Sequence, residues 1–254
     1  MSDNQPIIRE DVQGFLALAN SLPKPERLDP VEQRAGYLAL KQMTEADPRE
    51  MAVIKDLTCP GPAGPIPVRF YDVRENRDPS PVVLFFHGGG FVIGDLDTHN
   101  SLCTELSAEL DLPVLAVHYR LAPEHPFPAA PDDCEAAARW LAASPAELGR
   151  KVTGLVTIGG SAGGNLATVT ARALCDKPAA APMLLQVLLY PCTDESEDGS
   201  MVRFAEGHLL TKLAMEWFFS LYLPKSGDPR AFPLHASAAG MCPTIVATAG
   251  LDPL

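Results

Sequence analysis

Short apolar segments alternate with longer helix-length segments along most of this chain, and this alternation limits its fold more than any other feature. β-branched runs bounded by Pro or Gly lie at residues 52–57, 66–71, 82–86, 114–118, 155–158, 184–190 and 244–248. Several are apolar throughout, as in strands of a parallel sheet that is covered on both faces. Helix-length segments lie between them at 99–110, 132–141 and 164–174. The pattern predicts an α/β fold with a mainly parallel sheet flanked by helices.

Two regions depart from this alternation. Within the first fifty residues, apolar side chains recur at helical spacing in 12–18 and again in 31–38. Residues 202–223 are expected to form one amphipathic helix between two strands, with an apolar stripe of Leu209, Leu210, Leu213, Trp217, Phe218 and Leu221. This stripe suits either a helix packed on the rest of the protein or the wall of an apolar pocket.

Composition excludes several classes of protein. A chain of 254 residues with 46% hydrophobic content is long enough for one large domain. The formal net charge of −12 argues against a nucleic acid or an anionic membrane as partner. The sequence contains no long apolar run and does not begin like a signal peptide, so we expect a soluble, cytoplasmic protein. The six cysteines are scattered without metal-binding spacing, and no metal ion, cofactor or disulfide framework is expected.

A serine set among glycines follows the run at 155–158. Residues 159–163 fit the pattern G-x-S-x-G, between a predicted strand and a predicted helix. A sharp turn there holds Ser161 in a strained conformation, so its neighbours must be small, and the helix that follows directs its positive end toward the serine. A phosphate-binding loop is the alternative. The spacing G-x-G-x-x-G is not met, however, and no Lys-Ser or Lys-Thr pair follows, which disfavours a nucleotide site.

A second glycine-rich motif follows the run at 82–86. Residues 87–91 read His-Gly-Gly-Gly-Phe, and three consecutive glycines leave backbone amides free to face a pocket. Such a loop, together with the amide after the serine, forms an oxyanion hole in acyl transfer. A flexible glycine turn is the simpler interpretation of the loop alone. The two motifs in this order, each after a strand, favour the catalytic interpretation.

These motifs resemble those of the hormone-sensitive-lipase-like esterases of the α/β-hydrolase superfamily. The matching segments are residues 87–91, 119–130, 159–165, 190–191 and 249–254. The resemblance implies a helical cap made of residues 1–50 and an insertion at about 195–225, over a body of residues 51–254. Where this family usually has Asp or Thr, the chain has Gly160.

The resemblance also implies roles for individual residues. Ser161 is expected to be the nucleophile and Asp252 the acid of the catalytic triad. The expected oxyanion hole consists of the amides of Gly89, Gly90 and Ala162, with Gly88 shaping the loop and His87 supporting it.

The base of the triad has no evident candidate. This fold orders the triad Ser, Asp, His along the chain, whereas every histidine precedes Asp252: His87, His99, His118, His125, His208 and His235. His118 is expected in the core, His125 in a proline-rich loop, and His99 and His235 at the surface or behind the site. His208 could line the pocket, but a cap helix is a poor platform for a base.

We therefore expect a chain that ends before the helix, the strand and the histidine-bearing loop of a complete enzyme. Its last strand, at 244–248, would then be an unprotected sheet edge through which the protein could form a homo-oligomer. The expected activity is hydrolysis of short- to medium-chain carboxylic esters by serine acyl transfer, weak or absent without the base. The alternatives are a non-catalytic protein that binds a small molecule on the same scaffold and a non-functional fragment.

Overall fold

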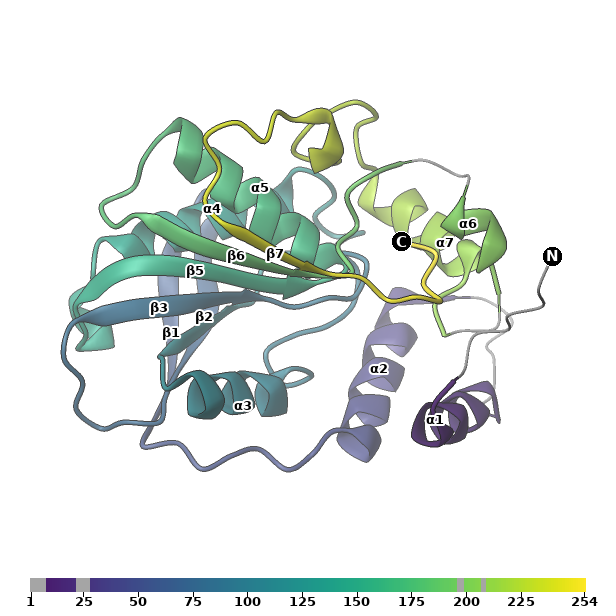
Figure 1. Ribbon diagram of the computed structural model, residues 1–254, viewed down its shortest axis with the longest axis horizontal. Coiled ribbons are helices and arrows are strands. Elements are labelled where there is room, and N and C mark those ends of the chain that lie inside the picture. Colours follow the sequence, from purple (N-terminus) through teal and green to yellow (C-terminus); the bar gives the residue numbers. More distant parts are fainter. Residues whose placement is uncertain (1–7, 22–27, 196–198, 207–208) are drawn as a thin grey trace.

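The chain folds around one seven-stranded sheet with the strand order β1-β2-β4-β3-β5-β6-β7 (Figure 1). The computed structural model describes residues 8–21, 28–195, 199–206 and 209–254. Strand β1 pairs antiparallel with β2, and β2 pairs antiparallel with β4. The four remaining pairs, from β4 to β7, are all parallel. The expected mainly parallel α/β architecture is therefore confirmed.

Each of the seven apolar runs forms a strand. The strands are β1 (Val53–Gly61), β2 (Gly64–Asp72), β3 (Ser80–Phe86), β4 (Val114–Val117), β5 (Val152–Gly160), β6 (Met183–Leu189) and β7 (Thr244–Ala247). The helices are α1 (Glu10–Ser21), α2 (Pro30–Thr44), α3 (Asn100–Leu110), α4 (Ala129–Ala142), α5 (Ala162–Asp176), α6 (Ser200–Arg203) and α7 (Lys212–Tyr222). Two short 3-10 turns lie at Ala146–Leu148 and Pro233–His235.

The expectation of one continuous helix over residues 202–223 is wrong. The helix α6 ends at Arg203, and α7 begins only at Lys212. Thr211 has an extended backbone, and its hydroxyl accepts a hydrogen bond from the amide of Ala214 at 3.1 Å. A threonine in this position caps the start of a helix, so α7 begins there although the apolar stripe starts earlier.

Apolar side chains fill the space on both faces of the sheet. The larger cluster lies between the sheet and the helices α4 and α5, with Leu141, Leu155 and Leu166 fully buried. A smaller cluster under α3 includes Val83 and Val114. Such double coverage explains why the central strands are apolar throughout instead of alternating.

The helices α1, α2, α6 and α7 lie together beyond one end of the sheet, the end at which β5 and β6 finish (Figure 1). Trp217, Phe218 and Leu221 of α7 pack against the main core. By contrast, α1 and α2 contain no buried residue. None of the helices in the described part of the chain is long and apolar enough to cross a membrane.

The strand β7 forms one edge of the sheet in the described structure. It pairs with β6 only, and all four of its residues are exposed. Ile245 and Val246 keep 53% and 55% of their surface exposed although they point to opposite faces. Neither face of this edge strand is therefore covered in the structure.

Candidate active site

Ser161 occupies a sharp turn between β5 and α5. Its backbone has φ 54° and ψ −120°, a conformation that costs a residue other than glycine roughly 1–3 kcal/mol. A β-carbon at Gly163 would overlap the carbonyl oxygen of Phe86, and one at Gly159 would overlap that of Gly163. These glycines are thus required by close backbone contacts, and the elbow predicted from the motif is present.

The glycine loop lies directly against this elbow. A β-carbon at Gly88 would stand 3.0 Å from the carbonyl oxygen of Gly160 and 3.7 Å from the β-carbon of Ser161. Gly89 and Gly90 have φ values of 120° and 57°, which side chains rarely tolerate. Within the described residues neither amide donates a hydrogen bond, so both remain available to a ligand beside the serine.

The ring of Phe218 from α7 lies over Gly90, where any β-carbon would overlap it. The sequence allowed two interpretations of the apolar stripe of this helix, as packing on the rest of the protein or as the wall of a pocket. Phe218 does pack on the core cluster, and it does so immediately above the loop. Ala162, the first residue of α5, is buried beside Ser161.

His87, the residue expected to support the loop, makes a direct hydrogen bond to it. Its Nδ1 lies 2.8 Å from the carbonyl oxygen of Gly88 and must carry the proton, since a carbonyl only accepts. Tyr119 stacks on its ring at 4.2 Å and donates its hydroxyl to the His87 carbonyl at 2.8 Å. Burial lowers the pKa of His87 to about 4, so the ring is neutral at pH 7.

Two further histidines surround His87. The ring centroids of His99 and His118 lie 5.6 Å and 6.5 Å from that of His87. His99 was expected either at the surface or behind the site, and the structure places it behind the site: it is 8% exposed beside His87, and burial lowers its pKa to about 2. The His118 Nδ1 is buried without a partner among the described residues, so it is not the satisfied core histidine expected.

Asp252 follows β7, and Ser161 follows β5, so both residues come after the carboxyl ends of parallel strands. The amide of Ser161 donates to Leu189 O at 2.9 Å, and the amide of Tyr190 donates to Ala247 O at 2.6 Å, which aligns the ends of β5, β6 and β7. Burial raises the pKa of the Asp252 carboxyl, and a hydrogen bond from the Leu254 amide at 3.0 Å partly opposes this.

The structure pairs none of the described histidines with the hydroxyl of Ser161 by a hydrogen bond. His235 instead lies 3.2 Å from Glu195 and is exposed, and His125 borders a separate cavity. His208 lies outside the described residues. The roles expected of Ser161 and Asp252 therefore stay predictions, and no described histidine is in place as the base of the triad.

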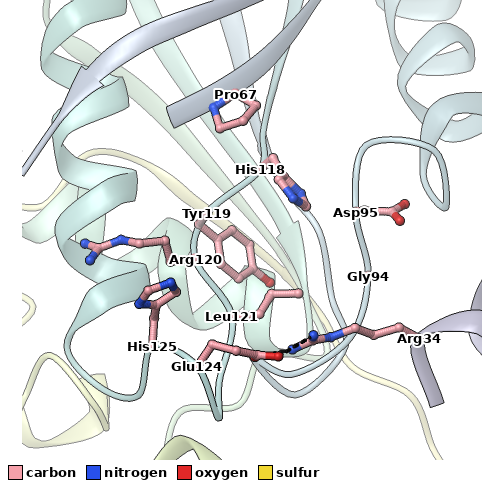
Figure 2. A pocket seen from close by; sticks show the side chains of 10 residues that line it. All are labelled: Arg34, Pro67, Gly94, Asp95, His118, Tyr119, Arg120, Leu121, Glu124 and His125. Atoms are coloured by element: carbon pink, nitrogen blue, oxygen red, sulfur yellow. Dashed lines mark hydrogen bonds and ion pairs between the residues drawn. The ribbon is translucent and has the colours of Figure 1, made fainter. Parts of the chain in front are cut away.

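A cavity of about 370 Å³ is lined by none of the predicted site residues (Figure 2). It is lined by Arg34, Pro67, Gly94, Asp95, His118, Tyr119, Arg120, Leu121, Glu124 and His125. At its rim Arg34 forms a two-pronged ion pair with Glu124. Glu124 was predicted only as part of the matching segment 119–130, and no pattern in the sequence indicated Arg34.

The sheet order, the serine elbow and the adjacent glycine loop define an α/β hydrolase. A family model described as the alpha/beta hydrolase fold matches residues 83–254, more than half of the chain. The chain therefore belongs to the α/β-hydrolase fold family, and the resemblance to its hormone-sensitive-lipase-like esterases is confirmed.

Individual relatives are ester hydrolases. The chain is 44% identical to carboxylic ester hydrolase LipN of Mycobacterium tuberculosis over 211 residues, which are 79% of this chain and 56% of LipN. It is 40% identical to ethyl acetate hydrolase of Pseudomonas putida over 197 residues, covering 74% of this chain and 62% of that protein. It thus spans little more than half the length of these two relatives.

A solved structure extends the comparison to three dimensions. The ester hydrolase EH1AB1 from the Lake Arreo metagenome, in complex with a bipyridine phosphonate derivative, superposes with a TM-score of 0.90 at 37% sequence identity. The match covers 97% of this chain and 82% of that one. The similarity therefore includes the helices beyond the sheet as well as the sheet itself.

Proposed function

We propose that this protein is a carboxylic ester hydrolase that works by serine acyl transfer. The observation that carries the proposal is the strained Ser161 elbow beside a loop with two unbonded amides, those of Gly89 and Gly90. An oxyanion hole needs donors that are already in place before charge develops on the substrate. A phosphate-binding loop or a structural turn would not require such a strained serine.

In the proposed mechanism, the Ser161 oxygen attacks the ester carbonyl carbon while its proton passes to a base, which the described residues do not supply and which Asp252 would orient. The carbonyl oxygen becomes an oxyanion, which accepts hydrogen bonds from the amides of Gly89, Gly90 and Ala162. The intermediate then collapses and expels the alcohol, which takes up the proton. Water repeats the sequence on the acyl-enzyme and releases the acid.

Short-chain acyl esters are the proposed substrates. Ethyl acetate hydrolase is named for a two-carbon acyl ester, and the Phe218 ring over Gly90 limits the space above the loop.

We further propose that residues 1–50 and about 195–225 form a cap, because α1, α2, α6 and α7 gather beyond the ends of the strands (Figure 1). All six cysteines are free thiols, which supports a reducing, cytoplasmic location.

The proposal predicts chemical rescue by an external base. The 254-residue chain alone should hydrolyse p-nitrophenyl butyrate only at the residual level of a site that lacks one triad member, roughly 10³–10⁴ above water. Added imidazole should raise this rate, since a small base can enter the position that the described histidines leave empty. The rate would be followed spectrophotometrically, with the reaction of imidazole and ester alone subtracted.

Ser161→Ala is the decisive control for the rescue. It should abolish the imidazole-dependent rate, and a p-nitrophenyl phosphonate should phosphonylate Ser161 of the parent chain only, with release of p-nitrophenol. His208→Ala should change neither result. If Ser161→Ala keeps the imidazole-dependent rate, or if the chain binds esters with no turnover under any condition, the proposed function is wrong.

A further inference from the structure

Arg34 of α2 makes hydrogen bonds to three residues in two loops of the body. Its Nε donates to the carbonyl oxygen of Val92 at 2.8 Å, and its Nη2 donates to that of Ala122 at 2.9 Å. Both terminal nitrogens also bind the Glu124 carboxylate, at 2.8 Å and 2.7 Å (Figure 2). One planar guanidinium thus joins a helix outside the sheet to two loops of the body.

The acceptors of these bonds belong to the backbone that holds the glycine loop. The amides of Val92 and Ile93 both donate to the carbonyl oxygen of Gly89 at 3.0 Å. The amide of Ala122 donates to Phe91 O at 2.9 Å. Arg34 therefore binds the carbonyls of Val92 and Ala122, two residues whose own amides bind the loop at Gly89 and Phe91.

The loop needs this support because its own sequence is permissive. Three consecutive glycines lose more conformational freedom on ordering than any other residues, and Gly89 and Gly90 hold positive φ values. On the opposite side, α7 supplies apolar contacts: Phe91 stacks on Tyr222 with ring centroids 3.9 Å apart. α2 buries no residue, and Tyr37 gives it a ring contact with His99. Among the described residues, the hydrogen bonds from α2 to the backbone beside the loop come from Arg34.

We propose that Arg34 is a positioning residue for the oxyanion hole, which couples the docking of α2 to the conformation of the Gly88–Gly90 loop. This inference rests on the proposed function for its catalytic consequence, though not for its structural one. Arg34 touches no reacting atom. It acts by keeping the peptides at Gly89 and Gly90 in the conformation whose amides face the serine elbow.

The planar guanidinium group of Arg34, and not only its charge, is required to bind the two carbonyls and the carboxylate together. A lysine at position 34 can pair with Glu124, but its single ammonium group does not reach two carbonyls and a carboxylate together. Exchanging the charges, with Arg34→Glu and Glu124→Arg in one chain, restores the ion pair and leaves both carbonyls without their donor. These variants separate the ion pair from the backbone bonds.

Amide hydrogen exchange tests the structural part without any need for activity. Exchange at Val92, Ile93 and Ala122 should be at least roughly tenfold faster in Arg34→Gln and in the charge-swapped chain, since hydrogen bonds to charged groups are lost. Arg34→Lys should be intermediate. Exchange in α5 should stay unchanged. Arg49→Gln, which removes exposed ion pairs to Glu105 and Glu109, is the matched control and should leave all these amides unaffected.

Imidazole-rescued hydrolysis tests the catalytic part of the proposal for Arg34. Arg34→Gln and the charge swap should lower kcat roughly tenfold or more with little change in KM, as for the loss of an interaction that acts in the transition state. If the parent chain shows no hydrolysis dependent on Ser161, the proposed function fails and the exchange data alone decide the role of Arg34. Equal exchange at Val92 and Ala122 in all variants, or faster exchange spread over α5, overturns the proposal.

Discussion

His87 is held neutral by its position in the fold. The ring is 2% exposed, and its neighbours are the uncharged rings of His99, His118 and Tyr119. Asp95 is the one carboxylate that opposes the shift, because its charge favours the protonated ring. A neutral ring can donate from Nδ1 to Gly88 without bringing a positive charge into the core.

Stability should therefore fall in mild acid. The pKa of His87 is about 4 in the folded protein and 6.5 when exposed, so the unfolded chain binds an extra proton between these values. The contribution of His87 to the free energy of unfolding is fully present above pH 6.5. It decreases as the pH falls toward 4, by on the order of 3 kcal/mol. Urea unfolding measured from pH 4 to pH 7 would reveal the slope.

A substitution isolates the contribution of this histidine. His87→Gln should flatten the slope between pH 4 and 6.5, whereas His125→Gln, at the rim of the cavity, should not. His99 and His118, whose pKa values burial also lowers, account for the slope that remains. A slope that is the same in His87→Gln and in the parent chain would contradict the assignment.

At the scale of single elements, two helical glycines have opposite roles. Gly163 lies in the first turn of α5, where a β-carbon would overlap the carbonyl oxygen of Phe86 at the end of β3. Gly36 lies in the middle of α2, where a β-carbon would meet nothing within 4 Å. Gly163 permits α5 to approach β3 closely. Gly36 only raises the conformational entropy of the unfolded chain.

Alanine at these two positions should change stability in opposite directions. Gly163→Ala should lower the free energy of unfolding by about 3 kcal/mol, because strand and helix must move apart. Gly36→Ala should raise it by roughly 0.5–1 kcal/mol, since alanine is the better helix former. Thermal unfolding followed by circular dichroism measures both. A destabilised Gly36→Ala variant would mean that α2 packs differently from the structure described here.

At the scale of the whole molecule, β7 is an edge of the sheet that no other element covers in the described part of the chain. Apolar residues on both faces of this strand are about half exposed, and its outer backbone groups have no partner strand there. Such edges pair readily with other chains. The 254-residue chain is therefore expected to self-associate through β7.

Charges on the edge should suppress this association. Ile245→Lys and Val246→Lys should each shift the sedimentation profile toward the monomer with little loss of stability, because both side chains are already half exposed. Leu213→Lys, on α7 and 70% exposed, is the control for a charge placed elsewhere. Equal self-association in all three variants would exclude β7 as the interface.

The strands and the nucleophile elbow could be predicted from the sequence because their signals are local. A strand covered on both faces must be apolar in each residue, and a sharp turn around Ser161 must have small neighbours. The break between α6 and α7 was missed, because the apolar stripe already includes Leu209 and Leu210, which precede the cap at Thr211. The sequence left His99 open between the surface and a place behind the site, since Tyr37 and Phe85, which contact its ring, come from other parts of the chain.

The sequence by itself determined the order of strands and helices along the chain, the chemistry expected of the serine and the family. Each of these depends on a few adjacent residues. Only the tertiary structure decided how the glycine loop is held. Arg34 and Glu124 are 90 residues apart, and Phe218 reaches Gly90 from the opposite side. Contacts between distant segments leave no periodicity in the sequence, so the support of the oxyanion loop becomes visible only when the chain is folded.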